Sequence, residues 1–130
     1  MSRPVLVDSS WYIQRARSGR DPLIELSLVV DSRDVATCGM ILAEVGRGVR
    51  VPRYLNRYLR AWREMMWIES TESVWSKTLE LAWHLDRKGE VLPVQDIHIA
   101  ACALEISAVL LTFDRHFALI PGLTVTDCLY

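Results

Sequence analysis

Short apolar runs alternate with helix-like patterns along this chain. The run Val5-Leu6-Val7 is apolar and mostly β-branched, which is typical of a short buried strand. Asp8-Ser9-Ser10 follows with good N-cap chemistry for a helix that ends at Gly19. Similar runs predict further strands at residues 35–38, 66–68, 109–112 and 123–125.

The intervening segments have helical patterns. Asp21-Pro22 caps a helix, Pro52 opens another that reaches about residue 64, and a third helix follows Pro93. Residues 40–45 predict one more helix, and Trp75, Leu79 and Trp83 recur at the period of a long helix between Thr71 and Gly89. Strands that alternate with helices predict an α/β fold with a parallel sheet covered on both faces. We expect one domain over residues 1–130.

Composition excludes several classes of protein. The chain has 130 residues, 51% of them hydrophobic and 24% charged, which excludes a disordered or low-complexity protein. No uncharged run approaches the ~20 residues that span a bilayer, and the first apolar run is too short for a signal peptide. We therefore expect a cytoplasmic protein without a membrane segment. The three cysteines (Cys38, Cys102 and Cys128) are expected to be reduced core thiols.

Positive charge gathers in one segment. The whole chain carries −1, yet residues 45–63 hold six arginines and no acid, which leaves −7 on the remainder. Arg53, Arg57 and Arg60 are spaced to form one stripe on a helix, and like charges at this spacing are mildly destabilising. The stripe is either a solvated face or a surface that contacts an RNA backbone or an acidic protein segment.

Four acidic residues stand at positions where chemistry is expected. Asp8 and Asp114 follow predicted strands, and Asp96 lies in the first turn of a predicted helix, so each is by itself also a plausible capping residue. Glu44 interrupts the apolar run 40–45, either as a partnered buried group or because that helix face reaches solvent. The carboxyl ends of parallel strands share one edge of the sheet, so these acids are expected to converge there.

Four converging carboxylates repel one another unless a cation binds. Oxygen ligands without Cys or His at metal spacing favour Mg²⁺ or Mn²⁺ over zinc. Such an ion takes substrate phosphate as a further ligand, which is the arrangement for phosphodiester hydrolysis.

Four segments resemble the PIN-domain ribonucleases, and among them the VapC-like toxins of type II toxin–antitoxin pairs. Their order and spacing match over nearly the whole chain: Val5-Leu6-Val7-Asp8-Ser9-Ser10, Ile41-Leu42-Ala43-Glu44, Asp96-Ile97-His98-Ile99-Ala100-Ala101 and Leu111-Thr112-Phe113-Asp114-Arg115-His116-Phe117.

The resemblance implies a five-stranded parallel sheet in an α/β/α sandwich and an endoribonuclease that leaves a 5′-phosphate and a 3′-hydroxyl. It implies an RNA substrate, a small antitoxin protein as partner, and a homodimer. By the same resemblance, Ser9 and Thr112 are polar supports, and Mg²⁺ or Mn²⁺ is held by Asp8, Glu44, Asp96 and Asp114. Many family members carry an acid or Asn in place of His116, so one or two metal ions remain possible, and His116 either contacts substrate or faces solvent.

Two other functions stay open. A phospho-acceptor receiver also has Asp at strand ends, but it normally needs a Lys near its pocket, and Lys77 and Lys88 both fall on the long helix before Gly89. A degenerate PIN fold that only binds protein is the other alternative. Among the remaining aromatic residues, Trp75 and Trp83 are expected to fill the core or a subunit interface. His84 is expected to be partly buried and His98 to lie on the exposed side of its helix.

Overall fold

The sheet is parallel throughout and has five strands. A computed structural model describes residues 3–129 of the chain. The strands lie in the order β3-β2-β1-β4-β5, so the sequence prediction of a five-stranded parallel sheet is confirmed. They are β1 (Val5–Val7), β2 (Val35–Cys38), β3 (Met66–Ile68), β4 (Val109–Leu111) and β5 (Thr124–Thr126).

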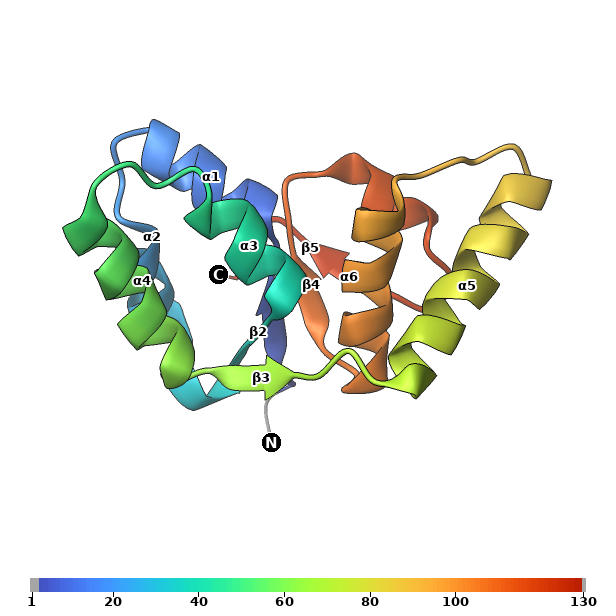
Figure 1. The fold of residues 1–130 in the computed structure, drawn as a ribbon, viewed down its shortest axis with the longest axis horizontal. Coiled ribbons are helices and arrows are strands. Elements are labelled where there is room, and N and C mark those ends of the chain that lie inside the picture. The colour runs from blue at the N-terminus through green and yellow to red at the C-terminus, as the bar shows by residue number, and fades with distance from the viewer. Residues whose placement is uncertain (1–2, 130) are drawn as a thin grey trace.

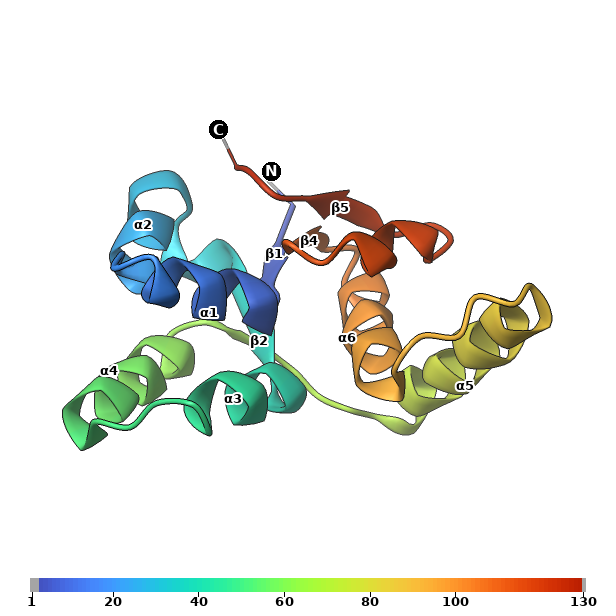
Figure 2. The same cartoon turned by 90° about the horizontal axis from the view of Figure 1, so that it is seen from above.

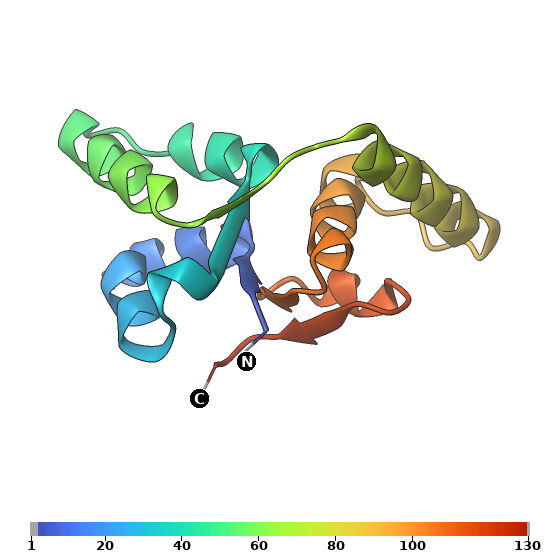
Figure 3. The same cartoon turned by 90° about the horizontal axis from the view of Figure 1, so that it is seen from below.

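Helices cover both faces of the sheet. The first four helices lie on one side and the last two on the other (Figures 1 and 2), as right-handed crossovers require when the chain first moves from β1 towards β3 and then returns to β4. The segment that follows β3 crosses between the two sides (Figure 3). The helices are α1 (Ser9–Arg17), α2 (Pro22–Val29), α3 (Gly39–Gly46), α4 (Pro52–Arg63), α5 (Glu72–Arg87) and α6 (Val94–Glu105), with short 3-10 helices at Ser32–Asp34 and Arg115–Leu119.

The direction of the crossovers reverses between β1 and β4. These two strands are neighbours, and their register pairs Val5 with Val109 and Val7 with Leu111. Ligands of open α/β sheets bind at such a point, beyond the carboxyl ends of the strands. The fold therefore sets a binding position at the residues that follow β1 and β4.

Local sequence accounts for the ends of the helices. The Asp21 carboxylate accepts hydrogen bonds from the amides of Leu23 and Ile24 (3.1 and 3.2 Å), with Pro22 in the first turn of α2. Gly19 and Gly89 follow α1 and α5 with φ near +76° and +78°, a conformation that glycine adopts without strain. Both helix ends were predicted from the sequence.

The core consists of the strands and the inner faces of the helices around them. Leu6 and Leu110 are fully buried in the central strands, and Tyr12 of α1 packs edge-to-face against Tyr58 and Trp62 of α4. None of the helices in the described part of the chain combines the length and apolarity that crossing a bilayer requires.

Three expectations about burial were wrong. His98 is 2% exposed, because α5 covers the face of α6 that the sequence left open, and its ring stacks on Trp75 at 4.0 Å. Trp75 and Trp83 are about half exposed (50% and 51%), which excludes the core and leaves a subunit interface as the alternative for them. His84 is exposed on α5, and Cys128 is exposed near the C-terminus, while Cys38 and Cys102 are buried thiols as expected.

Candidate active site

A cleft of about 400 Å³ opens at the carboxyl edge of the sheet, beside β1 and β4. Asp8, Asp96 and Asp114 line it together, although they come from opposite ends of the sequence. Asp8 follows β1, Asp114 follows β4, and Asp96 lies in the first turn of α6. The other lining residues come from α1: Ser9, Ser10, Ile13, Gln14 and Arg17.

Glu44 lies behind this cleft and does not line it. It sits in the second turn of α3. The Ser9 hydroxyl donates a 3.3 Å hydrogen bond to Glu44 Oε1 and so connects α1 to α3. Burial and then the charge of Asp8 raise the pKa of Glu44, against the effect of the Ser9 hydrogen bond. Glu44 therefore interacts electrostatically with the carboxylates that line the cleft.

Asp8 is held by hydroxyl groups. Its side chain is 3% exposed, and Oδ2 accepts hydrogen bonds from the hydroxyls of Ser10 (2.7 Å) and Thr112 (2.8 Å) and from the Ser10 amide (3.4 Å). The Ser10 hydroxyl also accepts from the Phe113 amide at 3.2 Å. Ser10 was missed in the sequence, where its type and position fit an ordinary helix start. All the hydrogen bonds that reach this carboxylate from residues 3–129 end on Oδ2, which leaves Oδ1 for a ligand.

Asp114 begins the 3-10 helix Arg115–Leu119 and contacts His116. Its Oδ1 accepts from the His116 amide at 2.9 Å and lies 3.1 Å from Nδ1 of the same residue. The amide of Asp114 donates in turn to the Thr112 hydroxyl at 3.0 Å. The His116 side chain is 66% exposed and does not line the cleft.

Asp96 is the carboxylate without a protein partner. No described residue donates a hydrogen bond or forms an ion pair with its side chain. Its pKa is raised to about 6, by burial first and then by the negative charges of Asp114, Asp8 and Glu44, while His116 opposes the rise. A carboxyl group in this setting binds a proton or a cation more readily than an ordinary aspartate does.

The chemistry of these donors fits a hard divalent ion. As the side chains stand in residues 3–129, no group of three or more His, Cys, Asp or Glu residues could hold a metal ion by itself. Mg²⁺, however, takes one or two carboxylates and keeps several waters or takes substrate phosphates. The unpartnered Asp96 and the open Oδ1 of Asp8 meet that requirement, with Asp114 beside them. The donor set is thus suited to an ion that completes its shell with water and phosphate.

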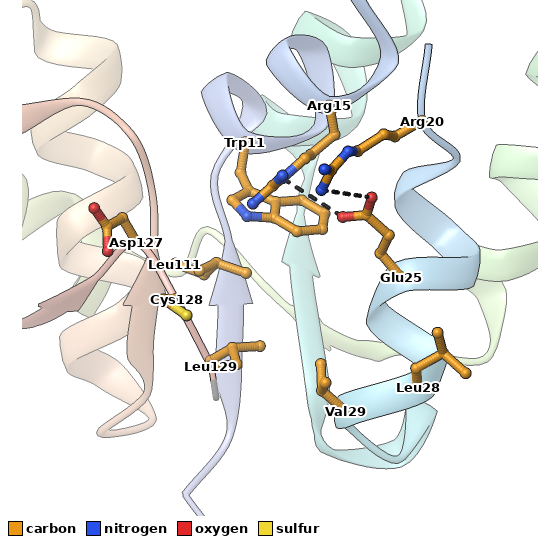
Figure 4. Close-up of a pocket in the computed structure, with 10 residues that line it drawn as sticks. All are labelled: Trp11, Arg15, Arg20, Glu25, Leu28, Val29, Leu111, Asp127, Cys128 and Leu129. Carbon is orange, nitrogen blue, oxygen red and sulfur yellow. Dashed lines mark hydrogen bonds and ion pairs between the residues drawn. The ribbon is translucent and has the colours of Figure 1, made fainter. Parts of the chain in front are cut away.

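A second hollow lies on the other side of α1, against α2 and the C-terminal segment (Figure 4). It measures about 310 Å³ and contains none of the four candidate acids. Arg15 spans it, 3.5 Å from the Glu25 carboxylate and 5.5 Å from the centre of the Trp11 ring. Because Arg15 and Arg20 both pair with Glu25 and none of the four acids lies here, this hollow is not the candidate active site.

The arginine stripe lies on α4, away from the cleft. None of Arg53, Arg57 and Arg60 lines the cleft. Arg57 pairs with Asp21 at 2.6 Å, so the inference that no acid relieves the stripe was wrong for this residue. Burial alone would raise the pKa of Asp21, but the hydrogen bond and charge of Arg57 help to hold it below its usual value. Arg53 packs over the Tyr54 ring at 5.0 Å.

Lys77 and Lys88 do not reach the acids. Lys77 lies 3.9 Å from Glu80 on α5, and Lys88 follows the last turn of that helix. Neither lines the cleft, so the described residues place no lysine where a phospho-acceptor receiver needs one.

The family is decided by the sequence over nearly its full length. The model of the PIN domain matches residues 5–123, which includes all four candidate acids. The chain belongs to the PIN-domain family. Among curated proteins, none matched this PIN-domain sequence.

Solved structures share the PIN fold seen here. A chain in the VapBC2 complex of Rickettsia felis, bound to a promoter DNA fragment, has a TM-score of 0.76 at 20% identity, over 94% of this chain and 96% of that one. A chain in the DNA-bound VapBC of Salmonella typhimurium has a TM-score of 0.77 at 17% identity, over 96% of this chain and 98% of that one. VapC20 of Mycobacterium tuberculosis is described as a sarcin-ricin loop cleaving toxin. It has a TM-score of 0.64 at 15% identity, over 88% of this chain and 92% of that one.

Proposed function

We propose that this PIN domain is a metal-dependent endoribonuclease and the toxin of a toxin–antitoxin pair. The observation that carries the proposal is the convergence of Asp8, Asp96 and Asp114 in one cleft, with Asp96 lacking any partner among the described residues. Structures of similar fold are described as members of toxin–antitoxin systems and, in one case, as a sarcin-ricin loop cleaving toxin.

The roles of the residues follow from their contacts. Asp8, Asp96 and Asp114 would hold Mg²⁺ or Mn²⁺, with Glu44 behind them contributing charge. When bound, the ion supplies an activated water and neutralises charge on the phosphate that is attacked. Ser10 and Thr112 fix Oδ2 of Asp8 and leave Oδ1 for the ion, whereas Ser9 orients Glu44. Three hydroxyl groups thus position two carboxylates before any ligand arrives.

Cleavage of RNA by the purified chain tests the proposal. With Mg²⁺ or Mn²⁺ present, the native chain should cut a single-stranded RNA, and Asp8→Asn, Asp96→Asn or EDTA should each reduce cleavage at least a hundredfold. Asp86→Asn, an exposed carboxylate on α5, is the matched control and should cleave at the native rate. Undiminished cleavage in EDTA would contradict the mechanism. Absence of cleavage in every condition would favour a PIN domain that only binds protein.

The toxin role predicts an effect on growing cells. Expressed alone, the native chain should arrest bacterial growth, and Asp114→Asn at equal soluble level should not. Coexpression of a small antitoxin should restore growth, and we propose that the arginine stripe on α4 contacts an acidic segment of that partner. This assignment fits the position of Arg53, Arg57 and Arg60 outside the cleft. A toxin that cleaves cellular RNA would act in the cytoplasm.

We also propose that the chain forms a homodimer. Trp75, Leu79 and Trp83 form an exposed apolar stripe on α5, with 50%, 68% and 51% of their surface open to solvent. Large side chains exposed in a row are typical of an interaction surface. A second copy of the chain would cover this stripe and explain its composition.

A further inference from the structure

The carboxylate cleft continues along one face of α1. Ser10, Ile13, Gln14 and Arg17 all line it, and their spacing of three, four and seven residues places them on a single helix face. From Asp8 to Arg17 the helix rises about 13 Å at 1.5 Å per residue. Helix α1 leads away from α6 over this length (Figure 2). The cleft is therefore a groove with carboxylates at one end and Gln14 and Arg17 at the other.

The charge distribution in this groove is uneven. Among the described residues that line it, Arg17 is the single cation, against Asp8, Asp96 and Asp114. RNA is a polyanion, so its phosphates are repelled from the acidic end wherever a bound cation does not neutralise it. A guanidinium at the far end attracts a phosphate that lies outside the reacting centre.

Arg17 is also available for such a contact. It is exposed in the last turn of α1, and among the described residues its side chain donates to none, pairs with none and stacks on none. Arg15, two residues earlier, turns to the opposite side and meets Glu25 (Figure 4). The two arginines of the last turn thus serve different surfaces, and Arg17 alone faces the groove.

We infer that Gln14 and Arg17 form a subsite that binds the RNA backbone beside the scissile phosphate. The inference rests on the proposed ribonuclease function and extends it, because it fixes the direction in which the substrate leaves the acidic centre. Arg17 contacts a flanking phosphate, and the Gln14 amide donates to a phosphate or ribose oxygen between the two ends. Ile13 supplies an apolar surface for the sugar.

The test is the salt dependence of RNA binding. Binding of a single-stranded RNA is followed by fluorescence anisotropy between 50 and 200 mM KCl, in EDTA and in the Asp96→Asn background so that the RNA stays intact. One phosphate contact contributes about 0.7 to the slope of log affinity against log salt. Arg17→Ala should lower the slope by that amount, so the parent loses roughly 2.6-fold more affinity than the variant over this range. Arg17→Lys should keep the slope. Gln14→Ala should weaken binding at every salt concentration without changing the slope.

Arg63 provides a matched control. It is an exposed arginine in the last turn of α4, just before β3 and so at the amino edge of the sheet, opposite the cleft. Arg63→Ala should keep the parental slope. If Arg17→Ala keeps it too while the native chain still cleaves RNA, the subsite is wrong and the ribonuclease proposal stands. Loss of antitoxin binding with an unchanged RNA slope would assign Arg17 to the protein partner. A native chain that neither binds nor cleaves RNA would overturn both proposals.

Discussion

The Thr112 hydroxyl donates a 2.8 Å hydrogen bond to Oδ2 of Asp8, a residue 104 positions earlier in the chain. Thr112 directly follows β4 and Asp8 directly follows β1, so this bond joins the ends of the two central strands. Both side chains are buried, at 2% and 3% exposure. The Thr112 hydroxyl therefore couples the folding of the central strands to the orientation of a candidate metal ligand.

Thr112→Val should destabilise the protein by about 1–3 kcal/mol, because a buried carboxylate loses a donor while the shape of the side chain is kept. Thr37→Val is the matched control, since Thr37 is a fully buried strand residue whose hydroxyl has no hydrogen-bond partner within residues 3–129. That substitution should be neutral or stabilising. Urea denaturation measures both, and an equal loss in the two variants would show that the Thr112 bond adds nothing specific.

The raised pKa of Asp96 predicts a pH-dependent stability. Folding raises this pKa from 3.8 to about 6, so the folded state holds the proton more tightly. The contribution of Asp96 to the free energy of unfolding therefore falls as the pH rises from about 4 to about 6, and it stays low at higher pH. In EDTA, the gain in Tm of Asp96→Asn over the native chain should grow across this interval. Asp86→Asn should show no such trend, and a constant difference for Asp96→Asn would refute the prediction.

A hard divalent ion should stabilise the native chain. If Mg²⁺ binds only the folded state, ten times its dissociation constant adds roughly 1.4 kcal/mol, or on the order of 3–5 °C in Tm for a domain of this size. Asp96→Asn should gain little. Monovalent salt at equal ionic strength screens charge without coordinating and serves as the control. If it reproduces the whole effect, the acids do not form a metal site.

The stripe on α5 predicts the oligomeric state. Leu79→Glu with Trp83→Glu places charge on the exposed apolar face, so a homodimer that uses this face should dissociate into monomers in analytical ultracentrifugation. Leu28→Glu is the control, because Leu28 is 78% exposed on α2, on the other face of the sheet. A native chain that sediments as a monomer at every concentration would exclude the dimer.

The sheet and the place of the acids could be predicted because both follow from local patterns. Short β-branched runs mark buried parallel strands, and the carboxyl ends of such strands share one edge. Asp8 and Asp114 were assigned to one cleft on that argument alone, and the structure brings them there together with Asp96. Glu44 follows β2 by six residues, so a strand-end argument places it only near the cleft, and the structure puts it behind Ser9.

Contacts between distant segments could not be predicted in the same way. Ser10 has the signature of a helix start, and only the neighbouring β4 segment reveals the Phe113 amide and Thr112 as its partners. The sequence showed no acidic partner for Arg57, because its partner Asp21 belongs to another helix. The burial of His98 depends on α5, which packs over α6 and places hydroxyls of Ser70 and Thr78 at 2.8 and 3.0 Å from the two ring nitrogens.

The neighbouring position of β1 and β4 has a consequence for synthesis on the ribosome. Asp8 emerges well before Asp96 and Asp114, and β4 must insert beside a strand made about a hundred residues earlier. Pairing at such sequence separation forms late in folding. A nascent chain consequently carries an incomplete carboxylate set until β4 and Asp114 have been made. Until that point, a chain that can cleave RNA would be harmless to the ribosome that makes it.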